Sequence, residues 1–263
     1  DEEAVGLELI QFLVEIFHTH DLFVPRFDRF VLPRFTARAT GNILPAHTRQ
    51  LSGGNLVKIT HVDVVPVGAF VYVRIDTAEG LYGIGEASLS GRSAAVVAAF
   101  EHLTPLLIGA DASRIEHIWQ DIYRGTFWRG GPVLQSALAG IDIALWDLAG
   151  KAMGVPTYRL LGGLARDRVL VYRHVGGGDP QGLVDSSRAL LAEGWKVLRI
   201  SPIKQDPAGF DPRRAILNGI DHMAALREDV GPEVEIIFEV HTRLSPARAV
   251  ELCSQLEPYH PFF

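Results

Sequence analysis

Residues 137–163 read ALAGIDIALWDLAGKAMGVPTYRLLGG, and this stretch carries most of the information about the fold. Its apolar residues recur at helical spacing, and Gly154 and Pro156 follow the run where a capping glycine and a helix-ending proline are expected. The sequence therefore predicts one long helix over 131–153. A glycine pair at 162–163 then separates two parts of the chain that have different patterns.

The part before this helix has the pattern of an antiparallel sheet followed by helices. Short alternating runs separated by turn residues predict three strands in a meander. Longer amphipathic runs follow them and predict two further helices. The expected strands are 57–65, 70–75 and 81–86, and the expected helices are 93–107 and 113–124.

The part after the glycine pair alternates strand and helix. This order is typical of parallel strands joined by helical crossovers. The length of each strand-helix unit matches that of a (β/α)8 barrel, which needs about 250 residues. The chain holds three such units, so we expect an α/β fold with an incomplete barrel. The expected strands are 168–175, 196–201 and 235–242, and the expected helices are 180–193, 211–229 and 245–256.

The composition is that of an ordinary globular protein. Of the 263 residues 48% are hydrophobic, and the formal net charge of -6 argues against a strongly basic nucleic-acid surface. The most apolar early run, 5–17, is shorter than the roughly 20 residues that span a bilayer, so we expect no membrane partner. The single cysteine, Cys253, cannot form an internal disulfide, is expected to be a small core residue, and fits a cytoplasmic location.

Four stretches together resemble one known family. They are 137–163, Gly83-Ile84-Gly85-Glu86, Phe127-Trp128-Arg129-Gly130-Gly131-Pro132 and 256–263. They are similar to the mandelate racemase and muconate lactonizing group of the enolase superfamily, and most similar to the galactonate dehydratase type of acid sugar dehydratases. The resemblance covers 57–263.

The resemblance implies a division into domains. Residues 56–163 would form an α+β capping domain, built from the three-stranded meander and its helices. Residues 164–263 would form the N-terminal part of the barrel, with its first three βα units only. Residues 1–55 would be an extension of uncertain structure. The chain would then be a truncated member of the family.

The resemblance also implies a reaction and a cofactor. Members of the family use Mg²⁺ to stabilise the enediolate that forms when a Lys or His base removes the proton next to a carboxylate. In the dehydratases the β-hydroxyl then leaves. The implied substrate is a small anionic sugar acid, and we expect a homo-oligomer.

Glu239 and His241 are the first candidate site residues. They are two apart near the end of the third expected barrel strand, so their side chains would share a face at the mouth of a barrel. By resemblance they match an Asp-x-His motif in which the acidic residue binds metal and the histidine acts as acid or base. Glutamate in place of aspartate departs from the motif and is one methylene longer. A charged pair at a strand end, with no role in chemistry, is the structural alternative.

One carboxylate does not make a Mg²⁺ site. By resemblance the other two acidic ligands belong to the fourth and fifth strands, beyond Phe263, and we expect no metal-dependent turnover from these 263 residues alone. The alternative function is that of a non-catalytic relative that acts, if at all, by association.

Three further residues are candidates for substrate binding. Arg199 stands on the second expected barrel strand, two residues before Ser201, which occupies the place of the base lysine in racemases and lactonizing enzymes. An unactivated serine hydroxyl is a poor base, which disfavours those reactions. Arg199 could orient a carboxylate or form a structural ion pair. Trp128 and Arg129 would lie on a capping-domain loop, either covering a sugar acid or serving as a helix N-terminal turn.

Overall fold

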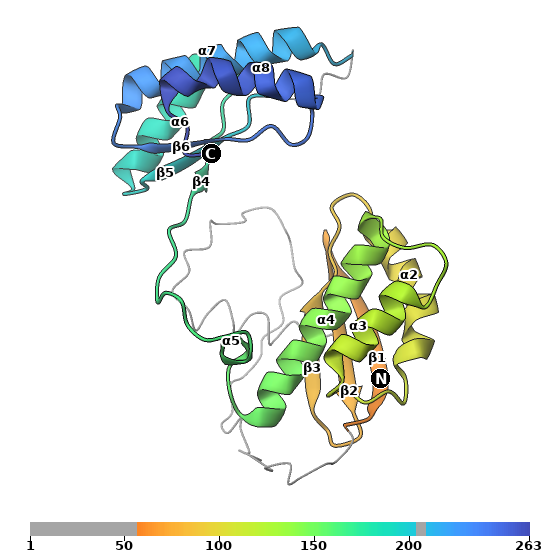
Figure 1. The fold of residues 1–263 in the computed structure, drawn as a ribbon. Coiled ribbons are helices and arrows are strands. Elements are labelled where there is room, and N and C mark those ends of the chain that lie inside the picture. Colours follow the sequence, from red (N-terminus) through yellow and green to blue (C-terminus); the bar gives the residue numbers. More distant parts are fainter. Residues whose placement is uncertain (1–56, 204–208) are drawn as a thin grey trace, which may run out of the picture. The chain divides into compact units, whose positions relative to one another are not determined.

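The computed structural model describes residues 57–203 and 209–263, and the extension expected at 1–55 lies outside the described residues. The chain divides between Ala165 and Arg166 into two compact units (Figure 1). Each described unit has its own hydrophobic core.

The first unit contains the expected antiparallel meander. Its strands are β1 (Ile59–Val67), β2 (Phe70–Thr77) and β3 (Tyr82–Glu86), in the order β1-β2-β3. The turn between β1 and β2 places Val67 opposite Phe70. The central strand alternates, and its residues Val71, Val73 and Ile75 are fully buried on one face. The three-stranded prediction is confirmed.

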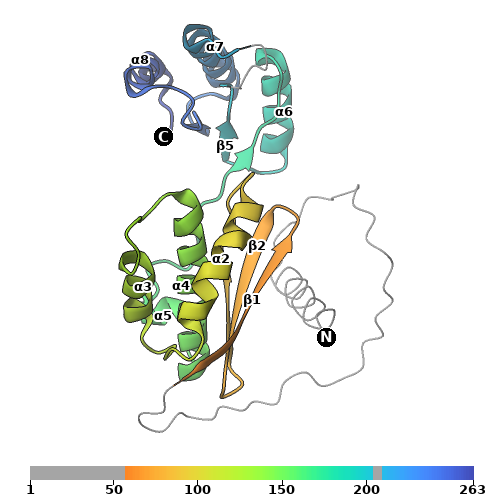
Figure 2. The same cartoon turned by 90° about the vertical axis from the view of Figure 1, so that its right-hand side faces the viewer.

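Helices cover that buried face (Figure 2). They are α2 (Ser93–Leu107), α3 (Ile115–Arg124) and α4 (Pro132–Met153), followed by the short α5 (Thr157–Leu160). The long helix α4 has proline in its first turn and ends at Gly154, whose φ of 66° is left-handed, as predicted. Its length and apolar composition would suit a membrane span, yet half of its most apolar window is buried within the unit.

Strand β3 approaches α4 unusually closely, and two glycines make this possible. A Cβ atom at Gly83 would lie 1.9 Å from the carbonyl oxygen of Ala144, and one at Gly85 would lie 2.0 Å from that of Gly140. No side chain fits in either place. The Gly-x-Gly pattern of the strand is therefore a packing requirement set by the helix backbone.

The second unit is a parallel sheet with helices on one face (Figure 1). Its strands are β4 (Arg173–His174), β5 (Val197–Ile200) and β6 (Glu235–Phe238), in the order β4-β5-β6. The connecting helices are α6 (Pro180–Ala192), α7 (Pro212–Val230) and α8 (Pro246–Leu256), and the 3-10 turn η1 (Glu257–Tyr259) follows. Ile200, Ile236 and Phe238 share a core cluster with residues of these helices.

The alternating strand-helix order is confirmed, with corrections in detail. The expected strand 168–175 pairs only at Arg173–His174, and the expected strand 235–242 ends at Phe238. Residues 168–172 of the first expected strand do not pair with β5, and Val169, Leu170 and Val171 are exposed. Cys253, expected in the core, is exposed on α8.

Candidate active site

The candidate residues of the second unit gather at one edge of its sheet. In parallel strands all carboxyl ends lie at the same edge, where α/β enzymes place their sites. His174 ends β4 and lies beside Arg199 of β5, and Glu239 follows the last residue of β6. Since Ile200 faces the helices, the neighbouring Arg199 points from the opposite face of the sheet.

Arg199 is the centre of the cluster. Its Nη2 donates to Oε2 of Glu239 at 2.5 Å, and its Nη1 lies 2.9 Å from Nε2 of His174. The ring of Tyr172 lies beside the guanidinium, with 5.4 Å between Cζ and the ring centroid. Only 13% of the Arg199 side chain is exposed. The guanidinium is therefore held from three directions.

Both carboxylate oxygens of Glu239 accept hydrogen bonds. Oε2 accepts from Arg199, and Oε1 accepts from the backbone N–H of His241 at 2.8 Å. The Arg199 hydrogen bond, followed by that from His241, lowers the pKa of the Glu239 carboxyl below its ordinary value. Glu239 is therefore ionised at neutral pH and fully engaged by the protein.

Glu239 and His241 do come together, but a turn brings them there. The alternation of a strand was the expected reason, whereas the strand ends before Glu239 and His241 has a φ of 52°. Thr242 follows with a φ of 55°, and two consecutive non-glycine residues in this region are uncommon. Such backbone strain concentrates at functional sites.

The imidazole of His241 is available to a ligand. Its side chain is 48% exposed, and its Nε2 lies 3.4 Å from the hydroxyl of Ser201 at the end of β5. Its Nδ1 lies 3.7 Å from Oε1 of Glu239. A histidine with one carboxylate neighbour and an open side can donate or accept a proton. The acid or base role of His241 stays a prediction.

Tyr172 and His174 belong to this cluster, and the sequence reasoning missed them. Their rings contact each other edge to face, with 5.5 Å between centroids. Burial, followed by the charge of Arg199, lowers the pKa of His174 and favours the neutral ring that can accept from the guanidinium. The available signal was the alternation of Tyr172 and His174 near the end of the expected strand 168–175, whereas Arg199 was found through the family resemblance.

Trp128 and Arg129 lie in the first unit, on the loop between α3 and α4. Trp128 is 80% exposed and contacts Phe127 edge to face. The hydroxyl of Thr126 donates to the carbonyl of Trp128 at 2.9 Å, and Gly130 follows with a φ of 77°. The loop thus presents its aromatic residues to solvent.

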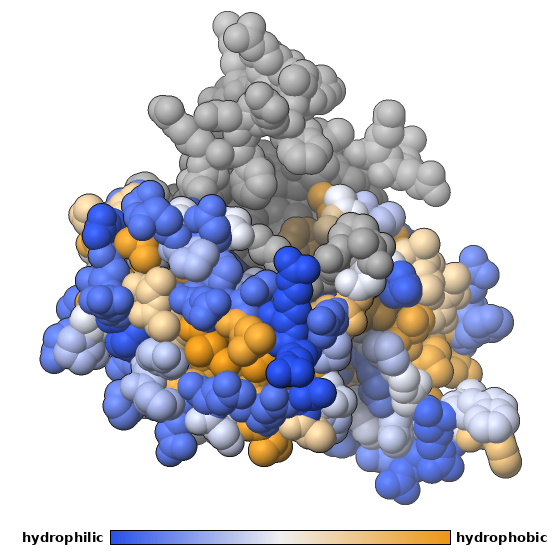
Figure 3. Space-filling view, turned by 90° about the horizontal axis from the view of Figure 1, so that it is seen from above, coloured by the Kyte–Doolittle hydropathy of each residue, from blue (hydrophilic) through white to orange (hydrophobic). Residues whose placement is uncertain are grey.

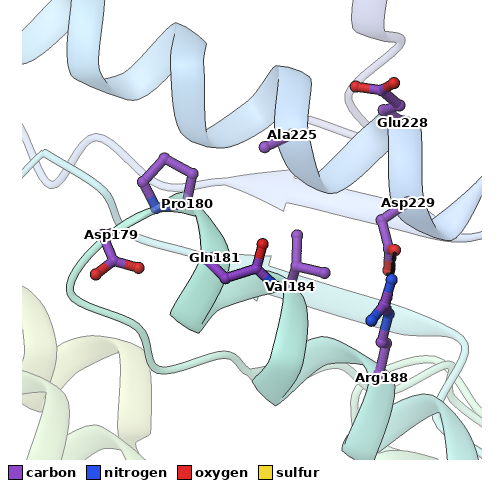
Figure 4. A pocket seen from close by; sticks show the side chains of 8 residues that line it. All are labelled: Asp179, Pro180, Gln181, Val184, Arg188, Ala225, Glu228 and Asp229. Carbon is purple, nitrogen blue, oxygen red and sulfur yellow. Dashed lines mark hydrogen bonds and ion pairs between the residues drawn. The ribbon is translucent and has the colours of Figure 1, made fainter.

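A separate hollow of 680 Å³ lies between α6 and α7 (Figure 4). Arg188 of α6 pairs with Asp229 of α7 across it, and Asp179 and Glu228 also line it. The hollow lies in the helix layer. On the face drawn in Figure 3, hydrophilic and hydrophobic residues are intermingled. Arg188 and Asp229 neutralise each other, Asp179 accepts a hydrogen bond from the backbone N–H of Gly182, and the hollow contains none of the residues of the sheet edge.

The donor set does not fit a magnesium ion as it stands. Mg²⁺ takes six oxygen ligands in near-octahedral geometry. Within residues 57–203 and 209–263, no group of three or more His, Cys, Asp or Glu side chains is placed to hold a metal. Glu239 is the one carboxylate at the sheet edge described above, and both of its oxygens already accept hydrogen bonds.

The fold and these motifs define an enolase-superfamily protein. Residues 58–162 match the N-terminal domain of the mandelate racemase / muconate lactonizing enzyme family. The crystal structure of a member of the enolase superfamily from Salmonella Typhimurium is 32% identical to the chain, with a TM-score of 0.70, and the match covers 79% of the chain and 60% of that one. Residues 58–162 therefore belong to this family, and the resemblance that the sequence predicted is confirmed.

Among its relatives are named dehydratases. The chain is 41% identical over 194 residues to the D-galactonate dehydratase of Ralstonia pickettii (strain 12J), which covers 74% of the chain and 50% of that protein. It is 38% identical over 234 residues to the D-galactonate dehydratase family member RspA of Cellvibrio japonicus (strain Ueda107), covering 79% and 58%.

The fold is also similar to that of solved structures. The crystal structure of an enolase from Pantoea ananatis with bound D-gluconate and Mg has a TM-score of 0.71 and 36% identity, covering 79% of the chain and 59% of that one. The chain spans about half the length of the curated relatives that it matches.

Proposed function

We propose that the chain serves the dehydration of a sugar acid. The observation that carries this proposal is the Glu239-x-His241 turn after the third parallel strand, at the same sheet edge as Arg199. Relatives named D-galactonate dehydratase and a related structure with bound D-gluconate and Mg support this class of substrate. In the reaction the proton next to the carboxylate and the β-hydroxyl leave together as water, and a keto-deoxy acid remains.

We propose that the second unit corresponds to the first three βα units of a (β/α)8 barrel, with the first unit as its capping domain. The parallel order β4-β5-β6 with helices on one face supports the first part. The match of 58–162 to an N-terminal domain family supports the second.

In this proposal His241 is the group that moves a proton, either as the base or as the acid that protonates the leaving hydroxyl. Arg199 binds the anionic end of the substrate, and Trp128 and Arg129 contribute contacts from the capping loop. Glu239 is the first ligand of a Mg²⁺ site that requires further carboxylates. Mg²⁺, when bound in such a site, stabilises negative charge next to the substrate carboxylate.

Ser201 bears on the choice between dehydration and the racemase and lactonizing reactions. Its hydroxyl lies 3.4 Å from Nε2 of His241. A hydroxyl is a weaker base than an amine at neutral pH. This favours dehydration over racemisation or cycloisomerisation.

The chain alone is expected to be inactive, because one carboxylate does not complete the metal site. The test incubates it with Mg²⁺ and D-galactonate or D-gluconate, and the keto-deoxy acid is detected as its semicarbazone. No product above a Glu239→Ala control is expected. Product above that control would show that a complete site forms without further ligands.

A fusion tests the dehydratase assignment itself. The chain is joined at Phe263 to the remaining residues of the Ralstonia pickettii D-galactonate dehydratase. The fusion should form product, and the same fusion with His241→Asn should not. A folded fusion that binds Mg²⁺ and forms no product from either acid would count against the proposal.

A further inference from the structure

The guanidinium of Arg199 places a positive charge beside the carboxylate of Glu239. Arg199 donates to Oε2 at 2.5 Å, while the backbone of His241 donates to Oε1 at 2.8 Å. The two side chains are 13% and 29% exposed, so water screens this pair only in part. The negative charge that would attract a metal ion is therefore already balanced inside the protein.

The ion pair is supported on the side away from Glu239. His174 lies 2.9 Å from the other terminal nitrogen of Arg199, and the ring of Tyr172 lies beside the guanidinium. These contacts fix the plane of the guanidinium and direct Nη2 at the carboxylate. A planar guanidinium held in this way keeps its partner better than a flexible lysine would.

The length of Glu239 is what allows the contact. Glu239 directly follows the last residue of β6, and its backbone N–H donates to the carbonyl of Ile200 at 2.9 Å. Its side chain extends from there to the guanidinium of Arg199 on β5 and to the backbone N–H of His241 in its own turn. An aspartate is one methylene shorter and would draw the carboxylate away from Arg199.

We infer that Arg199 is the resident counter-cation of Glu239, and that a divalent cation must displace it before Glu239 can bind metal. This inference rests on the proposed function only in taking Glu239 as a metal ligand. Each carboxylate oxygen keeps a second lone pair, but two positive charges at one carboxylate repel each other, so the guanidinium opposes metal binding there.

The test measures binding of Mn²⁺ alone to the fusion described above, because the chain by itself supplies one carboxylate. Binding is followed by the electron paramagnetic resonance signal of the free ion over the millimolar range. In the fusion, Arg199→Gln should bind Mn²⁺ about tenfold more tightly than the unchanged fusion, a typical coupling between two sites. Arg199→Lys keeps the positive charge and should stay near the unchanged fusion. Combining Glu239→Gln with Arg199→Gln should abolish the gain.

Glu239→Asp is the second variant, and it opens the ion pair while leaving Arg199 in place. It should also tighten Mn²⁺ binding, and circular dichroism of each variant checks its fold. If Arg199→Gln does not fold, Glu239→Asp decides alone. A folded Arg199→Gln with no gain in affinity, or a Glu239→Asp with none, would overturn the inference.

The outcome is independent of turnover. A gain in Mn²⁺ affinity in both variants, with no dehydration by the fusion described above, would reject the proposed function and keep the counter-cation. Dehydration by the fusion without any gain in affinity would do the reverse.

Discussion

Arg227, near the end of α7, donates a hydrogen bond from Nε to the backbone carbonyl oxygen of Tyr259 at 2.9 Å. Its terminal nitrogens donate to three more carbonyls, those of Gly231, Val234 and His260. Burial lowers the pKa of the guanidinium. One side chain thus ties a helix end, the loop before β6 and the segment after η1 together.

Replacing Arg227 by methionine should destabilise the second unit. The four carbonyls lose their donor, and each one that stays buried without a partner costs about 1–3 kcal/mol at most. We therefore expect the free energy of unfolding to fall by about 2–4 kcal/mol. Urea unfolding followed by circular dichroism measures the free energy of unfolding.

Arg188 provides the matched control, since it is an arginine on the neighbouring helix α6. Its side chain is 62% exposed and pairs with Asp229, whose side chain is 17% exposed. An ion pair with one exposed partner contributes little, so Arg188→Met should lower the free energy of unfolding by no more than about 1 kcal/mol. Equal losses in the two variants would show that the carbonyl contacts of Arg227 have no special role.

Gly85→Ala should destabilise the first unit strongly. The new methyl group would lie 2.0 Å from the carbonyl oxygen of Gly140, so β3 or α4 must move. We expect a loss of about 3 kcal/mol or more, in the range of severe packing defects. Thermal unfolding reports the loss, and Gly176→Ala, where nothing lies within 4 Å, should change little. An unchanged unfolding temperature in Gly85→Ala would contradict the close approach of β3 to α4.

The stability of the second unit should fall in acid, in part through Glu239. Its pKa in the folded protein lies below the ordinary value of 4.5, because Arg199 and then His241 donate to the carboxylate. The stabilisation is therefore complete above pH 4.5 and is lost as the pH falls through the lowered folded pKa. Urea unfolding at neutral pH and below 4.5 should show a smaller acid loss in Glu239→Gln than in the unchanged chain.

His174 is a useful internal control in that experiment. Its folded pKa lies below the ordinary 6.5, so the unfolded chain binds a proton first and stability decreases as the pH falls through 6.5. This loss should persist in Glu239→Gln and disappear in His174→Gln. An acid profile that neither variant alters would mean that other groups govern it.

The sequence predicted most elements of the fold because their patterns are local. The strands of the meander and the helices α2, α3, α4, α6, α7 and α8 follow from periodicity, turn residues and capping. The lengths of β4 and β6 do not, because alternation reports which face a residue prefers and says little about whether a neighbour pairs with it.

The candidate site was predictable only in part. Glu239, His241 and Arg199 follow from spacing and resemblance. The contact between Arg199 and His174 joins residues 25 apart through the register of neighbouring strands, which no local pattern encodes. The left-handed turn at His241 has no signal either, since it contains no glycine.

Trp128→Ala should separate binding from stability. The side chain is 80% exposed, so its removal should change the free energy of unfolding by no more than about 0.5 kcal/mol. If the loop contacts substrate as proposed, the fusion carrying this change should need a higher sugar acid concentration for half-maximal rate. An unchanged KM would remove Trp128 from the substrate-binding residues.

The contact of Gly83 and Gly85 with α4 has a consequence for local opening. Because helix carbonyls occupy the space that side chains would take, β3 and α4 pack backbone against backbone, and separating them breaks the contacts of both glycines. Amide protons of β3 and of the middle of α4 should then exchange with solvent through one shared opening event, at the same free energy. The long helix and the meander would form a single foldon despite being distant in the chain.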